Sequence, residues 1–541
     1  MRHRYLITSA LPYINGIKHL GNLIGSMLPA DVYARFLRQS GKDVLFICGT
    51  DEHGTPAEIA AEEAKQDVAT YCLEMYEKQK SLCEQFSLSF DYFGRSSSLE
   101  NHKLTTEIFN DLLQNGYIEK RPLKLYYSHQ DQRFLPDRYV MGTCPKCGYE
   151  KARGDQCDGC GSLLDPTDLK NPYSSISGDF NLELRESEHF FLKLNALQDK
   201  VQNFVETHDW NAMTKGIAKK WLQEGLKERC ISRDLKWGIP IPDSDKVFYV
   251  WFDAPNAYIS ITIDLLGESL AKSWWYDSQD VLYTQFMAKD NVPFHAIFWP
   301  AVLMGTGRSW HQVDQLKSFG WLTYEGGKFS TSQKRGVFMD QALALYPSDY
   351  WRYYLMANIP ETDDADFSFK VFAQMINKDL ADILGNFINR AVTLVHKYCD
   401  GTVPFVALND ERFDGLVIDY KAALDKLQFR QAMATLRKIW DFGNEFMALH
   451  EPWKLIKTEP DKGRIILAQS IWLIHQYAML SKPIIPDTSD TIMALLNQPL
   501  DYMFDNIITP KTWTVNAASP LFKKVTDEEV IEHSARFGGV E

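Results

Sequence analysis

Two short motifs, far apart in the chain, carry residue types that bind phosphate. Residues 18–22 read Lys-His-Leu-Gly-Asn and follow a strand-like apolar run at residues 4–11, while residues 326–332 read Gly-Gly-Lys-Phe-Ser-Thr-Ser. A helix-periodic stretch at residues 23–37 follows the first motif, which predicts a strand that passes directly into a helix. Such a crossing points backbone N–H groups and the positive end of a helix dipole at an anion.

Either motif alone is typical of an ordinary turn or surface loop. The order of the two motifs and the segments beside them favour a phosphate-binding function. Residues 11–16 (Leu-Pro-Tyr-Ile-Asn-Gly) precede the first motif, and residues 49–55 (Gly-Thr-Asp-Glu-His-Gly-Thr) close the next strand-like run. Later come residues 249–255 (Tyr-Val-Trp-Phe-Asp-Ala-Pro) and residues 288–295 (Ala-Lys-Asp-Asn-Val-Pro-Phe-His). Chance does not produce all of these segments in this order.

Four of the nine cysteines form two pairs with metal-ligand spacing. Cys144 pairs with Cys147 and Cys157 with Cys160, and a glycine follows each pair. Thiolates two residues apart can hold one ion, and the glycines permit tight turns. Two disulfides are the alternative, but an odd cysteine total and the absence of a secretory signal favour zinc. Four thiolates fill the tetrahedron, so we expect one structural zinc ion. The other cysteines, Cys48, Cys72, Cys83, Cys230 and Cys399, are predicted to be small buried apolar residues.

Composition sets the class of protein. The chain has 541 residues, 45% hydrophobic and 24% charged, which predicts a globular protein of roughly two to four domains. No uncharged apolar stretch reaches about 18 residues, so we expect no membrane span, and without a secretory signal we expect a cytoplasmic location. The net charge of −13 favours small substrates over nucleic acid. However, residues 215–236 carry seven Lys and Arg side chains, which leaves tRNA binding open.

An alternating strand–helix pattern is interrupted once along the chain. It runs through residues 1–115 and resumes over residues 231–325. The interruption, residues 116–230, is rich in Pro, Gly and Cys and contains the cysteine region 143–161, as expected for an insertion inside a nucleotide-binding domain. Residues 373–541 are helix-periodic, which predicts a separate all-α region. Strand-like runs are found at residues 44–48 and 247–251, and helix-periodic runs at residues 23–39, 58–86 and 294–304.

With these segments in order, the chain resembles the class I aminoacyl-tRNA synthetases, whose signatures are written HIGH and KMSKS, and among them the methionyl-tRNA synthetases. The resemblance covers essentially the whole chain. The sequences of residues 7–11, 288–291 and 327–330 are similar to those of the archaeal and eukaryotic branch of the family. It implies an α/β, Rossmann-like catalytic domain with a zinc-knuckle connective insertion. Residues 326–372 would form the KMSKS-like loop and a stem-contact segment, and residues 373–541 an α-helical anticodon-binding domain.

The resemblance also implies an activity. A methionine–tRNA ligase activates L-methionine with ATP to methionyl adenylate and transfers the methionyl group to the terminal adenosine of tRNA(Met). That product serves protein synthesis, including initiation. Mg²⁺ would accompany ATP, and we expect a monomer.

The family's functional residues map onto this chain one by one. Asp51 would hold the amino group of methionine and Arg233 its carboxylate. Around the thioether would lie Leu11, Tyr13, Trp251, Ala254, Pro255, Tyr258, His295 and Trp299. ATP would be bound by His19, Gly21, Asn22, Asp290, Gly320, Trp321, Lys328, Ser330 and Thr331. The catalytic set would be His19, Asn22, Lys328, Thr331 and Lys334, and the anticodon readers Asn386, Arg390 and Trp453.

Four departures from the family pattern matter. Asn22 replaces the second histidine of HIGH, and Ala288 stands where many relatives have glycine beside the ribose. Residues 126–133 and 171–179 lack the further cysteine pairs of two-knuckle relatives, which also favours one zinc ion. Thr331 replaces the second lysine of KMSKS, so we expect Lys334 or Arg335 to supply the missing charge.

Two alternatives stay open at this point. A class I synthetase for leucine, valine or isoleucine is disfavoured because no second insertion is large enough for an editing domain. A cysteine enzyme needs a catalytic zinc, which four saturating thiolates do not provide. The other alternative is a tRNA-binding paralogue without catalysis, and Thr331 is its only support.

Overall fold

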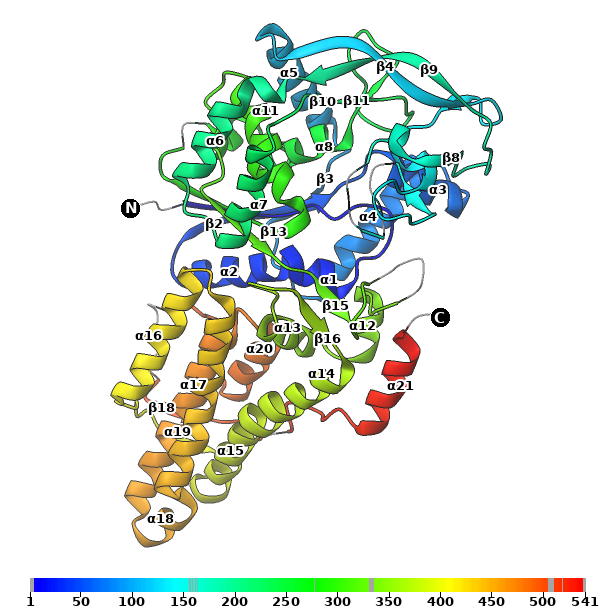
Figure 1. Cartoon of the computed structure of the whole chain (residues 1–541). Helices are drawn as coiled ribbons and strands as arrows, with labels where there is room; N and C mark the ends of the chain where they lie inside the picture. The colour runs from blue at the N-terminus through cyan, green and yellow to red at the C-terminus, as the bar shows by residue number, and fades with distance from the viewer. Residues whose placement is uncertain are drawn as a thin grey trace.

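The computed structural model describes residues 4–154, 157, 159–160, 162, 164–276, 278–329, 335–504, 510–517 and 519–538. At its centre lies a five-stranded parallel sheet in the order β14-β13-β1-β2-β3 (Figure 1). The strands are β1 (Arg4–Ser9), β2 (Asp43–Thr50), β3 (Tyr92–Arg95), β13 (Val281–Ala288) and β14 (Gln315–Phe319). The strand order reverses at β1, and in such sheets ligands bind in the crevice beyond the carboxyl ends at this point.

Both faces of the sheet are covered, so most residues of the strands are buried, polar ones such as Thr8 and Ser9 included. Neighbouring residues of β1, Leu6 and Ile7, are fully buried in two different hydrophobic clusters, as the alternation of side chains along a strand requires. Helix α2 (Leu28–Gln39) covers the Ile7 face. The Leu6 face is covered by helices α5 (Leu99–Gln114), α9 (Ala257–Leu266) and α11 (Trp299–Gly305).

Two expected elements differ from the sequence prediction. The run at residues 58–86 is two helices, α3 (Thr55–Ala64) and α4 (Val68–Gln85), because Lys65 adopts a left-handed conformation (φ 55°) and Asp67 caps the second helix. The expected strand at 247–251 ends after two residues as β12 (Val247–Phe248). Helix α8 (Val250–Asp253) follows at once, so Trp251 lies on a helix.

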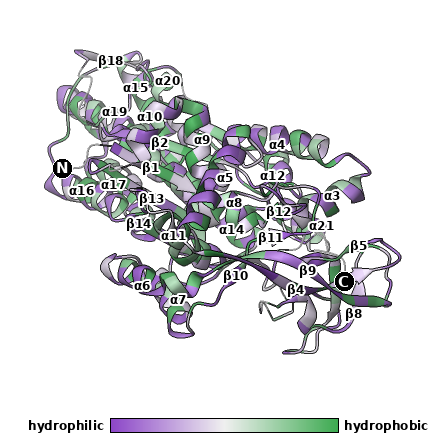
Figure 2. Ribbon diagram, turned by 90° about the horizontal axis from the view of Figure 1, so that it is seen from above, coloured by the Kyte–Doolittle hydropathy of each residue, from purple (hydrophilic) through white to green (hydrophobic). Residues whose placement is uncertain are grey.

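The insertion is built on a long antiparallel ribbon that projects to one side of the catalytic sheet (Figures 1 and 2). Strand β4 (Ile118–Ser128) pairs along its whole length with β9 (Leu182–Leu192), and β5 (Arg133–Phe134) and β10 (Arg229–Cys230) flank them. A second sheet joins β6 (Val140–Thr143), β7 (Ala152–Arg153) and β8 (Lys170–Ser174) and carries the paired cysteines.

Glu58 of helix α3 fastens the insertion to the first half of the catalytic domain. Its Oε2 accepts hydrogen bonds from Tyr139 Oη (2.8 Å) and Arg133 Nη2 (3.1 Å). Its Oε1 accepts the backbone N–H groups of Lys236 (3.1 Å) and Trp237 (2.9 Å). One buried carboxylate therefore joins three separate chain segments.

Below the sheet, a parallel pair of strands and a helical body complete the fold (Figure 1). Strand β15 (Leu322–Tyr324) pairs with β16 (Ala365–Phe367). Helices α12 (Met339–Leu345) and α13 (Ser348–Ala357) lie between these two strands in the chain. The helices that follow the strands are α14 (Phe369–Met375), the π-helical η8 (Ile376–Gly385), α15 (Asn386–Cys399), α16 (Glu411–Asp425), α17 (Phe429–His450), α18 (Pro452–Thr458), α19 (Pro460–Ser481), α20 (Pro486–Leu495) and α21 (Asp527–Phe537). The small ladder of β17 (Thr402–Pro404) and β18 (Thr512–Thr514) closes this body.

A buried arginine joins the helical body to the catalytic domain. Arg352 of α13 is fully buried, and its Nη2 donates to Asp31 Oδ2 of α2 (2.6 Å) and to the carbonyl oxygen of Pro483 (2.9 Å). Its Nη1 and Nε donate to the carbonyl oxygens of Phe86 (3.0 Å) and Ile484 (2.9 Å).

Among the helices of the described part of the chain, none has the length and apolar character needed to cross a bilayer.

Candidate active site and metal centre

The first motif lies where β1 passes into helix, as expected. His19 caps α1 (Leu20–Asn22), which continues through the π-helical η1 (Leu23–Met27) into α2. His19 Nδ1 accepts the N–H of Asn22 (3.3 Å), and Asn22 Oδ1 accepts the N–H of His19 (3.2 Å). Burial, with the charge of Lys18, lowers the pKa of His19 to about 3. The imidazole is therefore neutral with its proton on Nε2, which is free to donate to a phosphate oxygen.

Glycines in this motif allow a close approach of backbone to neighbouring groups. A Cβ at Gly21 would lie 2.9 Å from the ring of His19, and one at Gly25 would lie 3.5 Å from the Cβ of Ala288. Ala288 lies opposite Gly25 of η1, where even a Cβ on Gly25 would be at an ordinary van der Waals distance, so the Ala288 side chain fits among its protein neighbours.

The second motif folds back onto the first. The ring of Phe329 stacks on His19 with 4.6 Å between centroids. Arg335 Nη2 donates to the carbonyl oxygens of Tyr324 (3.0 Å) and Glu325 (3.1 Å), so this predicted substitute cation holds a turn. Three predicted site residues, Ser330, Thr331 and Lys334, lie outside the described residues.

The predicted adenosine side gathers around Trp321. Its indole Nε1 donates to Asp290 Oδ1 (3.3 Å), and the ring lies 5.4 Å from Lys328 Nζ. Trp321 is 38% exposed, and Lys289 Nζ also lies over its ring, 4.1 Å from the centroid. Gly320 is required beside it, because a Cβ there would lie 2.7 Å from Asp364 Oδ1.

Asp51 directly follows β2 and is buried, and one of its carboxylate oxygens lacks a hydrogen-bond donor among the described residues. Only 3% of the residue is exposed, and its Oδ1 has no hydrogen-bond partner among the described residues. Burial, and the nearby carboxylates Asp253 and Glu52, raise the pKa of Asp51 well above its ordinary value. Such an oxygen is costly unless a donor or cation reaches it.

The predicted thioether residues form an aromatic cluster beside it. Tyr258 Oη lies 3.0 Å from His295 Nε2, and the ring of Tyr258 lies 5.6 Å from Trp299. Burial lowers the pKa of His295 to about 4, and its Nδ1 donates to the carbonyl oxygen of Asn291 (3.0 Å). His295 is therefore neutral and accepts the Tyr258 hydroxyl proton. Leu11 packs half-buried against this cluster, and Ala254 and Pro255 are buried on the 3₁₀ turn η5 (Ala254–Asn256).

Arg233 lies at the outer wall of the same site. Together with Tyr13 and Trp251 it lines a cavity of about 30 Å³. Its Nε donates to Asp137 Oδ2 (2.7 Å), and its guanidinium lies 4.0 Å from the ring of Tyr249. These contacts fix the orientation of the guanidinium.

Three site features escaped sequence reasoning. Phe294 stacks on Trp251 with 3.7 Å between centroids, and only its place beside His295 hinted at this. His53 Nδ1 pairs with Asp253 Oδ2 behind Asp51. Lys18 Nζ donates to Asn15 Oδ1 (3.0 Å), and burial lowers the pKa of Lys18 to about 7 despite the opposing charge of Asp51. Lys18 is therefore an amine that is only partly charged at neutral pH and that feels the charge of Asp51.

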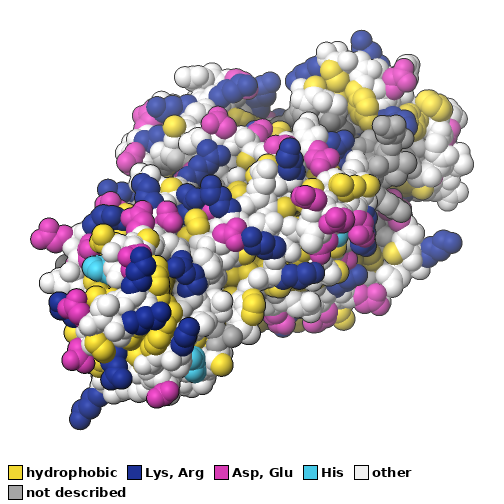
Figure 3. Space-filling model, turned by 90° about the horizontal axis from the view of Figure 1, so that it is seen from below, with side chains coloured by type: hydrophobic (Ala, Val, Ile, Leu, Met, Phe, Trp, Pro, Cys, Tyr) yellow, Lys and Arg dark blue, Asp and Glu magenta, His cyan; other side chains and the backbone are white. Residues whose placement is uncertain are grey.

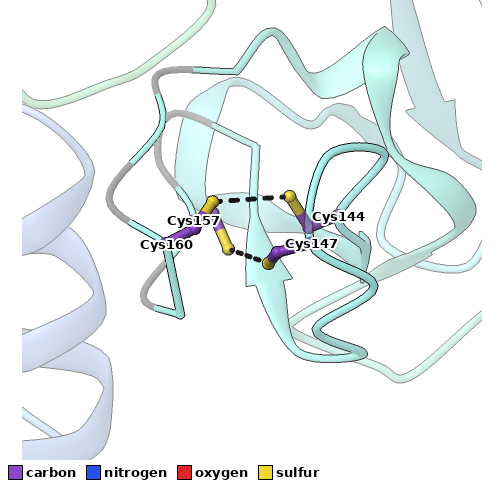
Figure 4. A group of neighbouring side chains, drawn as sticks. All are labelled: Cys144, Cys147, Cys157 and Cys160. Atoms are coloured by element: carbon purple, nitrogen blue, oxygen red, sulfur yellow. Dashed lines mark hydrogen bonds between the residues drawn. The ribbon is translucent and has the colours of Figure 1, made fainter.

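The four paired cysteines converge in the insertion (Figure 4). Their sulfur atoms all lie within 4.8 Å of one another, with Cys144 and Cys160 3.9 Å apart and Cys147 and Cys157 3.6 Å apart. A Zn–S bond of about 2.3 Å places the sulfurs of a tetrahedral site about 3.8 Å apart, whereas a disulfide bond is about 2.05 Å. The cluster fits zinc, and none of these four cysteines forms a disulfide bond.

Where two-knuckle relatives would have a second cysteine set, this chain has a hydrogen-bonded turn. Asp131 Oδ2 accepts from the hydroxyls of Ser174 (2.6 Å) and Ser177 (3.0 Å). The N–H of Asp131 donates to Ser128 Oγ (3.0 Å). Hydroxyls and one carboxylate hold these two loops together here.

At the far end of the helical body, the predicted anticodon residues meet. The guanidinium of Arg390 lies 5.4 Å from the ring centroid of Trp453, which joins α15 to α18. Asn386 is located one turn before Arg390 on α15. Seen from below, this tip shows hydrophobic side chains among Lys and Arg (Figure 3). Exposed members near it include Leu449, Lys454 and Lys457.

The chain is similar to known proteins along its whole length. The family model described as tRNA synthetases class I (M) matches residues 5–392, and that of the anticodon binding domain of methionyl tRNA ligase matches residues 407–541. Methionine–tRNA ligase 1 of Acaryochloris marina is 50% identical over 558 residues, covering 99% of this chain and 100% of that protein. Methionine–tRNA ligase of Streptomyces avermitilis is 49% identical over 571 residues, covering 99% of each chain.

The fold has solved counterparts. Methionyl-tRNA synthetase of Mycobacterium tuberculosis in complex with methionyl-adenylate has a TM-score of 0.77 at 24% identity, covering 96% of this chain and 99% of that chain. A second structure of the same protein bound by methionyl-adenylate also has a TM-score of 0.77, at 23% identity, covering 96% of this chain and 100% of that chain.

Proposed function

The chain belongs to the class I methionyl-tRNA synthetases and is a methionine–tRNA ligase, and from this premise we propose which of its residues perform each step. The reaction joins L-methionine to ATP, releases pyrophosphate and passes the methionyl group to tRNA. The proposal rests on Asp51, whose buried carboxylate oxygen Oδ1 has no hydrogen-bond partner among the described residues. Loss of L-methionine- and ATP-dependent pyrophosphate exchange in an Asp51 variant tests it, and full exchange in that variant would contradict it.

Methionine binds between Asp51 and Arg233. The ammonium group supplies the cation that the Asp51 Oδ1 lacks among the described residues, and the Arg233 guanidinium, held by Asp137, receives the carboxylate. The thioether lies against the rings of Tyr13, Trp251 and the Tyr258–His295 pair. Sulfur is polarisable and packs well on aromatic edges.

ATP binds across the two motifs. The Nε2–H of neutral His19 and the side chain of Asn22 meet the phosphates, while Asp290 and Trp321 receive the ribose and adenine. Lys328, with Lys334 of the same loop and Lys18, neutralises charge that develops when the methionine carboxylate attacks the α-phosphorus. Bound Mg²⁺ would neutralise further phosphate charge. The protein contributes positioning and charge, without a covalent nucleophile.

We expect one zinc ion per chain, held by Cys144, Cys147, Cys157 and Cys160. Metal analysis of the purified protein should give about one zinc, because four thiolates close one tetrahedral site. Cys144→Ser should lose the metal, whereas Cys399→Ser, outside the cluster, should keep it. A value near two, or full zinc in Cys144→Ser, would contradict the assignment.

The tip of the helical body should read the anticodon. Trp453→Ala and Arg390→Ala are expected to lower aminoacylation about ten- to a hundredfold, because a base stacked on an aromatic ring contributes about 1–3 kcal/mol. Pyrophosphate exchange should be spared in both. Arg412→Ala is the matched control, since it removes another cation–π contact of the same body, 5.0 Å from Phe442. Equal loss in both assays would show that Trp453 and Arg390 are structural.

The proposal also gives the protein a location and an oligomeric state. We infer that it works in the cytoplasm, because charged tRNA is used there in protein synthesis, and that it is a monomer. Sedimentation of the purified chain tests the oligomeric state.

A further inference from the structure

Cys230 ends a line of hydrogen-bonding groups that the reaction does not use. It is partly exposed at the end of β10, unlike the buried Cys48. Its Sγ lies 3.9 Å from Ser232 Oγ, which lies 2.8 Å from His189 Nδ1. His189 Nε2 lies 2.9 Å from Asp234 Oδ2. The Cys230 Sγ also donates to the carbonyl oxygen of Ser232 (3.4 Å), and the order Cys–Ser–His–Asp connects this partly exposed thiol to a buried imidazole and a carboxylate.

The hydrogen atoms along this line are fixed by the other partners. Ser232 Oγ already accepts the N–H of Phe190 (2.9 Å), so its own hydrogen is available to a neighbour. Lys246 Nζ, 2.5 Å from Asp234 Oδ1, keeps that carboxylate ionised. Although burial lowers the pKa of His189, Asp234 and Cys230 raise it to about 9. A charged His189 donates from both nitrogens, which turns the Ser232 hydroxyl towards Cys230 Sγ.

The thiol is the group that gains from this arrangement. Burial raises the pKa of Cys230, but His189 and the Arg233 guanidinium lower it further, so the net shift is downward. Partly exposed cysteines next to cationic side chains react as thiolates. Cys399 is also partly exposed, but burial raises its pKa. The two cysteines share the same exposure class but have pKa shifts in opposite directions.

We propose that Cys230 is a modification site whose thiolate is oxidised by hydroperoxides. The sulfur attacks one peroxide oxygen, an S–O bond forms and the O–O bond breaks, so the thiolate is oxidised to sulfenic acid and the peroxide is reduced. The leaving group, hydroxide from hydrogen peroxide or alkoxide from an organic hydroperoxide, takes the proton that His189 passes through Ser232 and departs as water or as an alcohol.

Oxidation at this position reaches the methionine site through Arg233. Arg233 Nη1 donates to the carbonyl oxygens of Cys230 (3.2 Å) and Ser232 (2.9 Å). An added oxygen on Cys230 crowds the turn that carries both carbonyls, and the guanidinium shifts with it. This consequence, but not the reactivity itself, rests on the proposed role of Arg233 in binding the methionine carboxylate.

Alkylation rates test the reactivity. With iodoacetamide at pH 7, the full-length zinc-loaded protein should label Cys230 about tenfold faster than Cys399, measured per cysteine by peptide mass spectrometry. The rate at Cys230 should also reach half its maximum at a lower pH than the rate at Cys399. His189→Gln should slow Cys230 at least fivefold and leave Cys399 unchanged. Equal rates and equal pH profiles at the two cysteines overturn the proposal.

Peroxide treatment tests the coupling. Hydrogen peroxide should produce a dimedone-reactive sulfenic acid at Cys230 and raise KM for methionine several-fold in pyrophosphate exchange, with KM for ATP unchanged. Cys230→Ser should show no such rise. If sulfenic acid forms while KM stays constant, the link to Arg233 is wrong. If Arg233→Ala also leaves KM for methionine unchanged, the fault lies in the proposed role of Arg233.

Discussion

Asp51→Asn should abolish most methionine activation. We expect kcat/KM for methionine in pyrophosphate exchange to fall by roughly 10²–10³, because losing one partner of a buried charged pair costs about 2–5 kcal/mol. Asparagine keeps the size of the side chain but cannot offer a full negative charge to the ammonium group. KM for ATP should change little, since Asp51 lies on the methionine side of the site.

The same substitution should stabilise the free protein at neutral pH. The folded-state pKa of Asp51 is raised by burial and by Asp253 and Glu52, so its ionisation costs folding free energy at every pH above its unfolded pKa. The uncharged amide of the Asp51→Asn variant would carry no such cost, and the thermal midpoint of the variant should rise. By the same sign, methionine binding to the wild type should weaken as pH falls through the raised pKa of Asp51.

Asp349→Asn is the matched control for Asp51. Asp349 is also buried with one carboxylate oxygen that lacks a partner among the described residues, and burial raises its pKa to about 6, but it lies on helix α13. Its replacement should leave kcat/KM for methionine within a few-fold. A similar loss in both variants, or a full-rate Asp51→Asn enzyme, would show that Asp51 does not bind the ammonium group.

Lys328→Ala should lower kcat of pyrophosphate exchange by roughly 10²–10³, the usual cost of removing one preorganised charge or donor. Lys334→Ala and Lys18→Ala should each lose more than a few-fold, since Thr331 leaves a charge to be replaced. Arg335→Ala should act mainly on the turn at Tyr324 and Glu325, whose carbonyl oxygens it binds. Lys370→Ala, at an exposed position of α14, is the control.

Single-turnover kinetics decide among these cations. If Lys328→Ala stays within a few-fold of the wild type, the loop does not neutralise the phosphates. If Lys328→Ala is nearly inactive but neither Lys18→Ala nor Lys334→Ala loses more than a few-fold, then Lys328 acts with Mg²⁺ alone.

Features that depend on residues close together in the sequence could be predicted. The spacing of Cys144, Cys147, Cys157 and Cys160 fixes which sulfurs can share an ion, and their convergence is confirmed. The apolar run at residues 4–11 predicted a strand, which is present as β1, and the comparisons confirm the fold class. The residue roles inherited from the family stay predictions, because no bound substrate tests them.

Long-range contacts escaped prediction because no periodicity encodes them. Arg4 of β1 pairs with Val281 of β13, across most of the catalytic domain's sequence. The stack of Phe294 on Trp251 joins a π-helical segment to a helix that the sequence pattern predicted as a strand. Apolar aromatic runs fit both states, and tertiary packing decides between them.

The buried Arg352 holds the helical body at a fixed position against the catalytic domain. It ties α2, beside the catalytic sheet, to the carbonyl oxygens at the end of α19, and such a desolvated ion pair resists opening. These contacts therefore oppose a movement of the helical body relative to the catalytic domain. Under the proposed function, a tRNA reaches the tip that carries Trp453 and the catalytic site at once, so its overall dimensions become a criterion of recognition alongside the anticodon bases.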